Sequence, residues 1–303
     1  MRGISRRNFV KLGAAGAAGV PFVLDGADAK AAAPTAQDIV DRIRTHVGLE
    51  WNPATVDTFK AGDPTTTVTG IVTTSLATID VMRRAVQAGA NMIVTSGPTF
   101  YSRADTPTLT GRRGAAPPPP DPIVTAKNDF ITRNRLVVWR FSDHWRARTP
   151  DPFVQGIVDT LGWTKYRVAS DPTRLAVPSI TIDALATRVK AQLKARGGIR
   201  VIGKPDAHVE KIAVLPGTIP IQTTLNVLPT VDVMIAGEIR EWESSEYARD
   251  LVRRGRGKAL ILVGRSLSED AGMNVCAEWL KTIISEAPIH WISAGDPYWR
   301  PRA

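Results

Sequence analysis

The most regular pattern of apolar and polar positions lies between Gly62 and Tyr101. Two short apolar runs there predict strands, and apolar residues recur at helical spacing between them. The strands lie at residues 68–72 and 91–95, and the apolar face of the helix contains Ile79, Met82, Ala85 and Val86. Ser75 stands where an N-cap residue would begin that helix. The second run ends abruptly at Ser96, so we expect the turn that follows to border a ligand crevice at the carboxyl end of a parallel strand.

Apolar runs and amphipathic segments alternate along the rest of the chain as well. Helical spacing is found at residues 36–47, 123–133, 153–161, 183–196, from 241 onward, and 269–284. Strand patterns are found at residues 136–141, 199–202, 211–215, 231–235, 259–263 and 289–292. Thr35 and Asp38 form a variant of the capping box before the first helix. This alternation predicts an α/β fold with largely parallel sheets.

The N-terminal segment matches a twin-arginine export signal. Arg6 and Arg7 are followed by Phe9 and Lys11, then by a mildly apolar run at residues 12–24. A small-x-small site at residues 27–29 predicts cleavage after Ala29, with alternative cuts after Ala31 or Ala33. The apolar run is too short to span a bilayer, so no transmembrane helix is expected in the mature protein. We therefore expect the twin-arginine translocase to deliver the protein to the periplasm or the cell exterior.

The predicted signal peptide at residues 1–29 leaves one α/β domain at 30–303, with halves at 35–170 and 171–303. A proline-rich segment at residues 106–122 predicts an exposed loop beside the crevice. The formal charge is +10, but the basic residues are dispersed and accompany no nucleic-acid-binding module, so no specific nucleic-acid binding is expected. Cys276 is the only cysteine, which excludes an intrachain disulfide, and its apolar neighbours predict a buried position.

Several residues could carry chemistry on their own patterns. Asp143 and His144 are the only adjacent carboxylate and imidazole, which suits either an acid–base pair, a weak metal site, or a structural hydrogen bond. Glu238 and Glu241 follow a predicted strand and could face a crevice or offset a helix dipole. Glu269 fits the last position of a capping box at the final helix.

The absence of several motifs argues against some classes of protein. The chain has no Gly-x-Ser-x-Gly elbow, no phosphate-binding loop that ends in Gly-Lys-Ser/Thr, and no Gly-x-Gly-x-x-Gly. The four histidines show no ligand spacing, so a zinc cluster is not supported. Serine hydrolases and nucleoside triphosphatases of the usual types are therefore not indicated.

A series of ordered blocks resembles the Nif-three-like dinuclear metal-centre proteins, often described as GTP cyclohydrolase type-two homologues. The blocks are Gly-Asp-Pro at 62–64, Val-Thr-Gly-Ile-Val-Thr-Thr at 68–74, Ala-Val-Gln-Ala-Gly-Ala-Asn at 85–91 and Ile-Val-Thr-Ser-Gly-Pro-Thr-Phe-Tyr at 93–101. The resemblance covers roughly residues 35–294. It implies two related α/β layers around a central cleft, and a ring-shaped homo-oligomer, commonly a hexamer.

The resemblance also implies where a two-metal site would lie. The positions of two adjacent histidines are occupied by Ser96 and Gly97, that of an aspartate by Arg146, and that of a further histidine by Arg265. Glu269 alone keeps the residue type of the family's ligands. Because arginine cannot act as a metal ligand, the two arginines could replace the positive charge of the metals.

The resulting hypothesis is an exported protein with a degenerate or rebuilt dinuclear site that binds a small anionic ligand or serves as a scaffold. Guanidinium groups suit carboxylates and phosphates, which favours an anion. The alternative is a metal-dependent hydrolase with a replacement carboxylate-rich site, for which a divalent metal would be the cofactor. Its candidate ligands are Asp143, His144, Glu238, Glu241 and Glu269.

Overall fold

A computed structural model describes residues 33–102, 105–107, 119–255, 257–299 and 301. The contacts divide the chain into Met1–Ala32 and Ala33–Ala303, and the second unit contains all the elements described below. The predicted signal peptide and residues 108–118 of the proline-rich segment lie outside the described residues. Within the described part, no helix is both long enough and apolar enough to cross a membrane.

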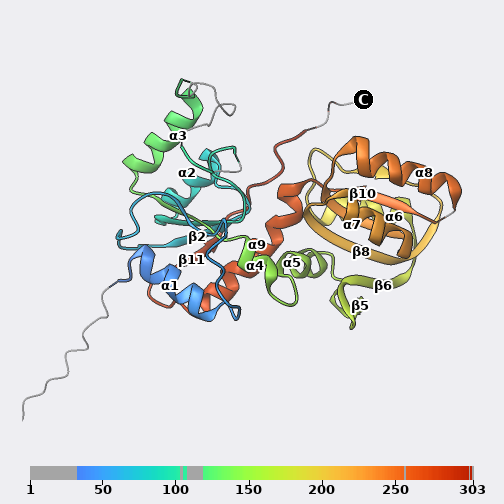
Figure 1. The fold of residues 1–303 in the computed structure, drawn as a ribbon, viewed down its shortest axis with the longest axis horizontal. Helices are drawn as coiled ribbons and strands as arrows, with labels where there is room; N and C mark the ends of the chain where they lie inside the picture. Colours follow the sequence, from blue (N-terminus) through green and yellow to red (C-terminus); the bar gives the residue numbers. More distant parts are fainter. Residues whose placement is uncertain (1–32, 103–104, 108–118, 256, 300, 302–303) are drawn as a thin grey trace, which may run out of the picture. The chain divides into compact units, whose positions relative to one another are not determined.

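The first sheet has the strand order β1-β4-β3-β2-β11 within the described residues (Figure 1). Its strands are β1 Phe59–Ala61, β2 Ile71–Thr74, β3 Met92–Thr95, β4 Val137–Arg140 and β11 Ile289–Trp291. The four strands from β4 to β11 are parallel, and β1 pairs antiparallel at the edge. Every residue of β2, β3 and β4 is buried, which explains their continuous apolar runs.

Four of the five helices described in this part were predicted, and the short helix α4 was not. They are α1 Ala36–His46, α2 Ile79–Gln87, α3 Pro122–Arg133, α4 Asp143–Ala147 and α5 Pro152–Thr160. The capping box at α1 is confirmed, because Thr35 and Asp38 satisfy each other's backbone N–H groups. The prediction that Ser75 caps α2 is wrong. Thr78, three residues later, accepts the hydrogen bond from the backbone N–H of Val81 and begins the helix.

The second sheet is mixed, with the order β5-β6-β8-β9-β10-β7. Its strands are β5 Arg167–Val168, β6 Asp171–Thr181, β7 Arg200–Ile202, β8 His208–Thr218, β9 Val233–Glu238 and β10 Ala259–Leu262. Only β8, β9 and β10 run parallel to one another, so the prediction of largely parallel sheets holds for the centre of this sheet and fails at its edges. The long strand β6 was not predicted, since two prolines and a bulge interrupt its pattern.

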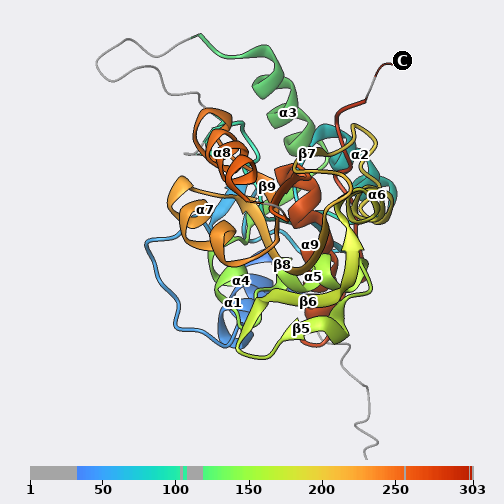
Figure 2. The same cartoon turned by 90° about the vertical axis from the view of Figure 1, so that its right-hand side faces the viewer.

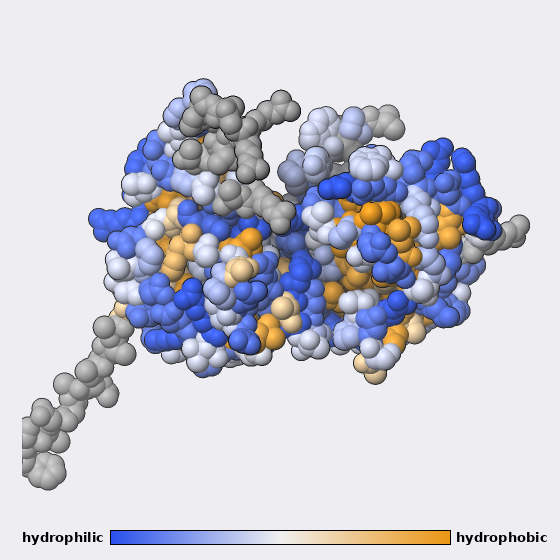
Figure 3. All heavy atoms as spheres, viewed as in Figure 1, coloured by the Kyte–Doolittle hydropathy of each residue, from blue (hydrophilic) through white to orange (hydrophobic). Residues whose placement is uncertain are grey.

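The helices connected to the second sheet complete the described elements. They are the 3₁₀ turns η1 Thr164–Tyr166 and η2 Leu228–Thr230, the π-helical turn η3 Glu241–Ser245, and the α-helices α6 Ile182–Gln192, α7 Ile221–Val227 and α8 Glu246–Arg254. The helix predicted from residue 241 is confirmed. The predicted end of α6 at Arg196 is four residues too late, because the chain turns at Lys194, whose φ of 52° lies in the left-handed region. In the view of Figure 3, apolar surface gathers around α7.

Helix α9, Arg265–Lys281, connects the two sheets. It contacts β2 and β11 of the first sheet as well as β8 and β9 of the second, and Figure 1 shows it between them. Figure 2 shows it beside α5. Its buried residues include Met273, Ala277 and Leu280. Cys276 is buried there as predicted, and burial raises the pKa of its thiol. Since β11 then returns to β2, the two sheets do not correspond to the predicted halves 35–170 and 171–303.

Helices α5 and α9 pack with their backbones in close approach. An added Cβ at Gly156 would lie 2.4 Å from the backbone of Ala271 and Gly272. Gly272 is equally crowded, because its Cβ would lie 2.7 Å from the Cα of Phe153. The crossing therefore needs glycine on both helices.

We predict that Gly156→Ala lowers the free energy of unfolding by about 1–3 kcal/mol, since the added methyl group must push the two helices apart. Gly255→Ala is the matched control, because Gly255 has extended backbone geometry and no atom within 4 Å of an added Cβ. Urea unfolding monitored by tryptophan fluorescence measures both. Wild-type stability in Gly156→Ala would contradict the described crossing.

Candidate functional site

The carboxyl ends of parallel strands from both sheets lie around one buried carboxylate, that of Glu269. The first-sheet turn at Ser96 follows β3, and Glu269 lies in the second turn of α9, after β10. The Ser96 hydroxyl donates to Glu269 Oε2 at 3.0 Å, and Arg146 Nη2 donates to Oε1 at 3.0 Å. Arg265 Nε lies 3.6 Å from the same Oε1. The Glu269 side chain is only 5% exposed, so two guanidinium groups compensate a nearly buried charge.

Arg146 contacts several protein groups besides Glu269. Its Nη1 donates to Asp151 Oδ2 and to the Pro216 carbonyl, each at 3.2 Å. Its guanidinium carbon lies 4.4 Å from the centre of the Phe153 ring. Asp151 also caps α5, and burial raises the pKa of its carboxyl while Arg146 opposes that rise. Arg146 is therefore committed to protein contacts.

Glycine at the end of β8 makes room for this ion pair. Gly217 has a φ of 88°, and an added Cβ would lie 2.9 Å from Glu269 Oε1 and 3.0 Å from Arg146 Nη2. Its backbone N–H donates to Ser268 Oγ at 2.9 Å, which ties the end of β8 to α9. Any larger residue at position 217 would displace the ion pair.

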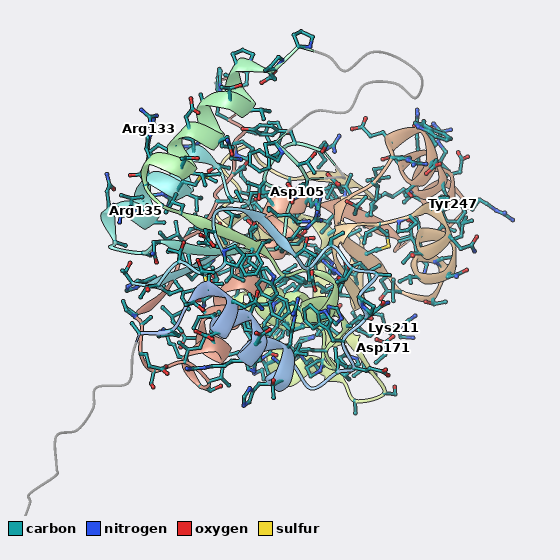
Figure 4. The ribbon with its side chains drawn as sticks, turned by 60° about the vertical axis from the view of Figure 1, so that its left-hand side comes forward. Asp105, Arg133, Arg135, Asp171, Lys211 and Tyr247 are labelled. Carbon is teal, nitrogen blue, oxygen red and sulfur yellow. The ribbon has the colours of Figure 1, made fainter. Side chains whose placement is uncertain are left out.

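The turn after β3 is clamped by buried charged side chains. Arg140 Nε donates to the Ser96 carbonyl at 3.2 Å, and Lys127 Nζ donates to the Thr99 carbonyl at 2.5 Å. Asp105 Oδ1 accepts the Thr99 N–H at 2.5 Å, and its Oδ2 lies 3.7 Å from Arg140 Nη1. Asp105 is buried and lies among the interior side chains in Figure 4. Burial lowers the pKa of Lys127 to about 8, although Asp105 opposes this.

Gly97 is required by close packing in the same turn. An added Cβ would lie 2.4 Å from Leu76 Cδ2 and 2.7 Å from the Ser75 carbonyl. The predicted site position 97 therefore contributes backbone only. Ser75 has a site role that its expected capping role did not suggest, because its hydroxyl donates to Asp270 Oδ1 at 3.0 Å and lies 3.1 Å from Ser266 Oγ.

A cavity of about 690 Å³ opens beside this cluster. Its charged lining residues are Arg200, Glu238, Glu241, Arg265, Glu269 and Asp296. Glu238 and Glu241 thus face the same cavity as Arg265, as the sequence suggested. Glu241 pairs with Arg200, and Glu238 accepts a hydrogen bond from the hydroxyl of Thr218. The cavity is therefore of mixed charge.

Asp143 and His144 lie elsewhere, on α4, and line a separate cavity of about 300 Å³. His144 Nδ1 lies 2.8 Å from Asp57 Oδ2, and its Nε2 accepts the Asn52 N–H at 2.9 Å. The ring also stacks on Trp51 at a centroid distance of 3.7 Å. Both ring nitrogens are used in the fold, which is a structural hydrogen-bonding role. The structure therefore does not bring together the five residues of the suggested carboxylate-rich metal site.

The residues around Glu269 do not fit a two-metal centre. Among the described residues, no group of three or more His, Cys, Asp and Glu side chains could hold a metal ion. Both oxygens of Glu269 accept hydrogen bonds, from Ser96 and Arg146. Arginine offers no lone pair to a metal. Glu269 also does not complete a capping box, because α9 begins at Arg265 without any side-chain cap.

This arrangement belongs to an α/β fold of the NIF3 type. No protein-family model matches the chain, and no curated protein matches it. The fold is similar to that of the Staphylococcus aureus hypothetical protein SA1388, with a TM-score of 0.65, 15% identity, and coverage of 88% of this chain and 99% of that chain. It is also similar to protein ybgI, of unknown function (TM-score 0.64, 17% identity, 87% and 100% covered). A Bacillus cereus protein related to NIF3 gives a TM-score of 0.62 at 13% identity, with 88% and 99% covered.

Sequence reasoning missed several residues of the site. Gly217 follows a proline at the end of a strand, which is a turn signal that could have directed attention to it. Arg140 ends the apolar run of β4, where a charged residue marks the carboxyl edge of the sheet. The C-terminal residues that line the cavity carried no comparable signal.

We predict that Glu269→Gln lowers the free energy of unfolding by about 1–3 kcal/mol, since it removes the negative charge that Arg265 pairs with and leaves Arg146 with Asp151 alone. Glu278→Gln on the same helix is the control. It breaks only the exposed contact with Lys281 (2.7 Å) and should cost less than about 0.5 kcal/mol. Equal unfolding midpoints in urea for the two variants would contradict the role given to Glu269.

The depressed pKa of Lys127 predicts a pH dependence. Between about 8 in the folded protein and 10.5, the ordinary value, the unfolded chain binds more protons. The free energy of unfolding of the wild-type protein should therefore rise with pH across this window, relative to that of Lys127→Met, by up to about 3 kcal/mol. Below about pH 8 the ammonium group is charged in the folded protein, and the full cost of burying it applies. Urea unfolding at several pH values measures this difference. Lys281→Met, on an exposed lysine, should keep the wild-type slope, and the same slope in Lys127→Met would disprove the assignment.

Proposed function

We propose that this protein belongs to the Nif-three-like family and that an arginine–glutamate cluster has replaced the family's dinuclear metal centre, so that the adjoining cavity binds a small anion. The observation that supports this most directly is the position of Arg146 and Arg265 around Glu269. These are three of the positions at which the sequence resemblance places metal ligands. The fold likeness to NIF3-related structures supports the same alignment.

The electrostatics of the cluster explain how the site can do without metal. A buried carboxylate needs a compensating positive charge, which two guanidinium groups supply here through one hydrogen bond and one ion pair. A divalent ion placed among them would meet two fixed positive charges. A two-metal hydrolytic mechanism, in which the ions bind both reacting oxygens, therefore has little support from these residues.

Arg265 is the group that would meet an anionic ligand. Arg146 donates to Asp151, Pro216 and Glu269, whereas Arg265 lines the cavity and contacts Glu269 through Nε alone. Among the described residues, its two Nη groups have no hydrogen-bond acceptor. Arg265 also begins α9, whose N-terminal N–H groups favour negative charge. The cavity end beside Arg265 is thus suited to a carboxylate or phosphate group.

Export and assembly complete the proposal. The twin-arginine sequence supports delivery of a folded protein to the periplasm or beyond. The family resemblance supports a homo-oligomeric ring, in which a scaffold role would make the cavity unimportant. The two roles differ in one respect, because a pure scaffold would bind no anion at Arg265.

We predict far fewer than two metal ions per chain in wild-type protein purified without chelator and measured by elemental analysis. The triple variant Ser96→His, Arg146→Asp, Arg265→His should gain bound zinc or manganese, since it restores three donors around Glu269 and leaves the crowded Gly97 unchanged. The single variant Ser96→His, which keeps both arginines, is the control and should gain none. Two metals per wild-type chain would overturn the proposal and favour the hydrolase.

A further inference from the structure

Two aromatic residues of the C-terminal segment line the 690 Å³ cavity together with Arg265. Tyr298 and Trp299 line the cavity, yet they are 71% and 72% exposed. Aromatic rings in a binding cavity present large flat apolar faces, and such faces prefer to stack against another ring. Two such rings in a cavity that Arg265 also lines indicate a ligand with an aromatic ring and a negative charge.

The segment that carries these rings is fastened in place. Asp296 Oδ2 accepts the Gly197 N–H at 2.6 Å, and its Oδ1 accepts the Tyr298 N–H at 3.0 Å. The packing is close, because an added Cβ at Gly197 would lie 2.4 Å from the Tyr298 Cβ. Farther back, Asp270 accepts the Ala294 N–H at 3.2 Å. The aromatic wall is therefore fixed by the loop after α6 and by α9.

The charges of the lining limit the anion to a single charge. Both carboxylate oxygens of Glu269 and both of Asp296 accept hydrogen bonds from protein groups. Arg200 and Glu241 compensate each other, whereas Glu238 has no cation partner among the described residues. Arg265 contacts Glu269 through Nε and has no acceptor for its two Nη groups among the described residues, so these groups can receive an anion. A ligand with several negative charges would meet like charge at Glu238.

We propose that the cavity binds a monocarboxylate that carries an aromatic ring, with the carboxylate on Arg265 and the ring against Tyr298 and Trp299. The apolar lining between these two ends comes from Leu76, Pro98 and Leu267. This proposal rests on the proposed function, which requires an anion at Arg265, and it adds the ring and the single charge.

Isothermal titration calorimetry with three probes tests the proposal on the full chain. Phenylacetate carries the ring, cyclohexylacetate has the same charge and nearly the same size without an aromatic face, and pyrophosphate carries several charges. Phenylacetate should bind ~3–10-fold more tightly than cyclohexylacetate, which is the range that aromatic stacking provides. Pyrophosphate should bind more weakly than both.

Variants locate the two ends of the ligand. Trp299→Ala and Tyr298→Ala should each remove most of the preference for phenylacetate, and Arg265→Lys should weaken both carboxylates, because lysine cannot form the paired hydrogen bonds. Trp242→Ala is the matched control. Trp242 is 73% exposed like Trp299 but does not line the cavity, so its loss should change neither affinity.

The outcomes separate the two proposals. Equal binding of both carboxylates that still depends on Arg265 would overturn the aromatic ligand and leave the anion site standing. Tighter binding of pyrophosphate would overturn the single charge. No binding of any probe would overturn both proposals. A change of molar mass by light scattering in Trp299→Ala or Tyr298→Ala would show that the rings pack between copies of the chain, which also overturns the aromatic ligand.

Discussion

The site depends on the compensation of one nearly buried negative charge. Glu269 lies where the carboxyl ends of strands from two sheets converge on α9, and a nearly buried charge in that place is costly unless cations or hydrogen-bond donors compensate it. Arg146, Arg265 and Ser96 supply them from three separate segments of the chain. The same contacts join α4 and the first sheet to α9. The groups that compensate the charge of Glu269 therefore also hold together the segments around the cavity.

These contacts of Glu269 depend in turn on neighbouring residues. Arg146 needs Asp151 and the Pro216 carbonyl to fix its guanidinium plane, and Gly217 must lack a side chain so that the ion pair fits. The turn after β3 must bring Ser96 close, and buried Arg140 holds its carbonyl. Arg265 lines the cavity, whereas Arg146 is not among its described lining residues. Arg146 thus stabilises the fold, and Arg265 faces the cavity.

Much of this fold could be predicted from apolar periodicity, because β2, β3 and β4 are buried on both faces and α1 begins at a complete capping box. Strand β6 was not predicted, since a half-buried strand with two prolines carries little apolar signal. The start of α9 was placed too late, because Gly264 begins it without the side-chain cap that the sequence suggested.

The candidate site, like the fold, could be predicted from the sequence only in part. Ser96, Arg146, Arg265 and Glu269 could be gathered by resemblance, although they are far apart in the chain. Asp143 and His144 could not be excluded by pattern, because only tertiary contacts show that both His144 nitrogens are used. The return of Tyr298 and Trp299 to the cavity depends on hydrogen bonds of Asp270 and Asp296 to distant segments, which no local pattern encodes.

The most direct test of the central claim is an anomalous difference map from crystals of the wild-type protein grown with zinc. The account predicts guanidinium density for Arg146 and Arg265 on either side of Glu269 and no anomalous peak within coordination distance of that carboxylate. A pair of anomalous peaks at Glu269, with the arginines turned away, would contradict it.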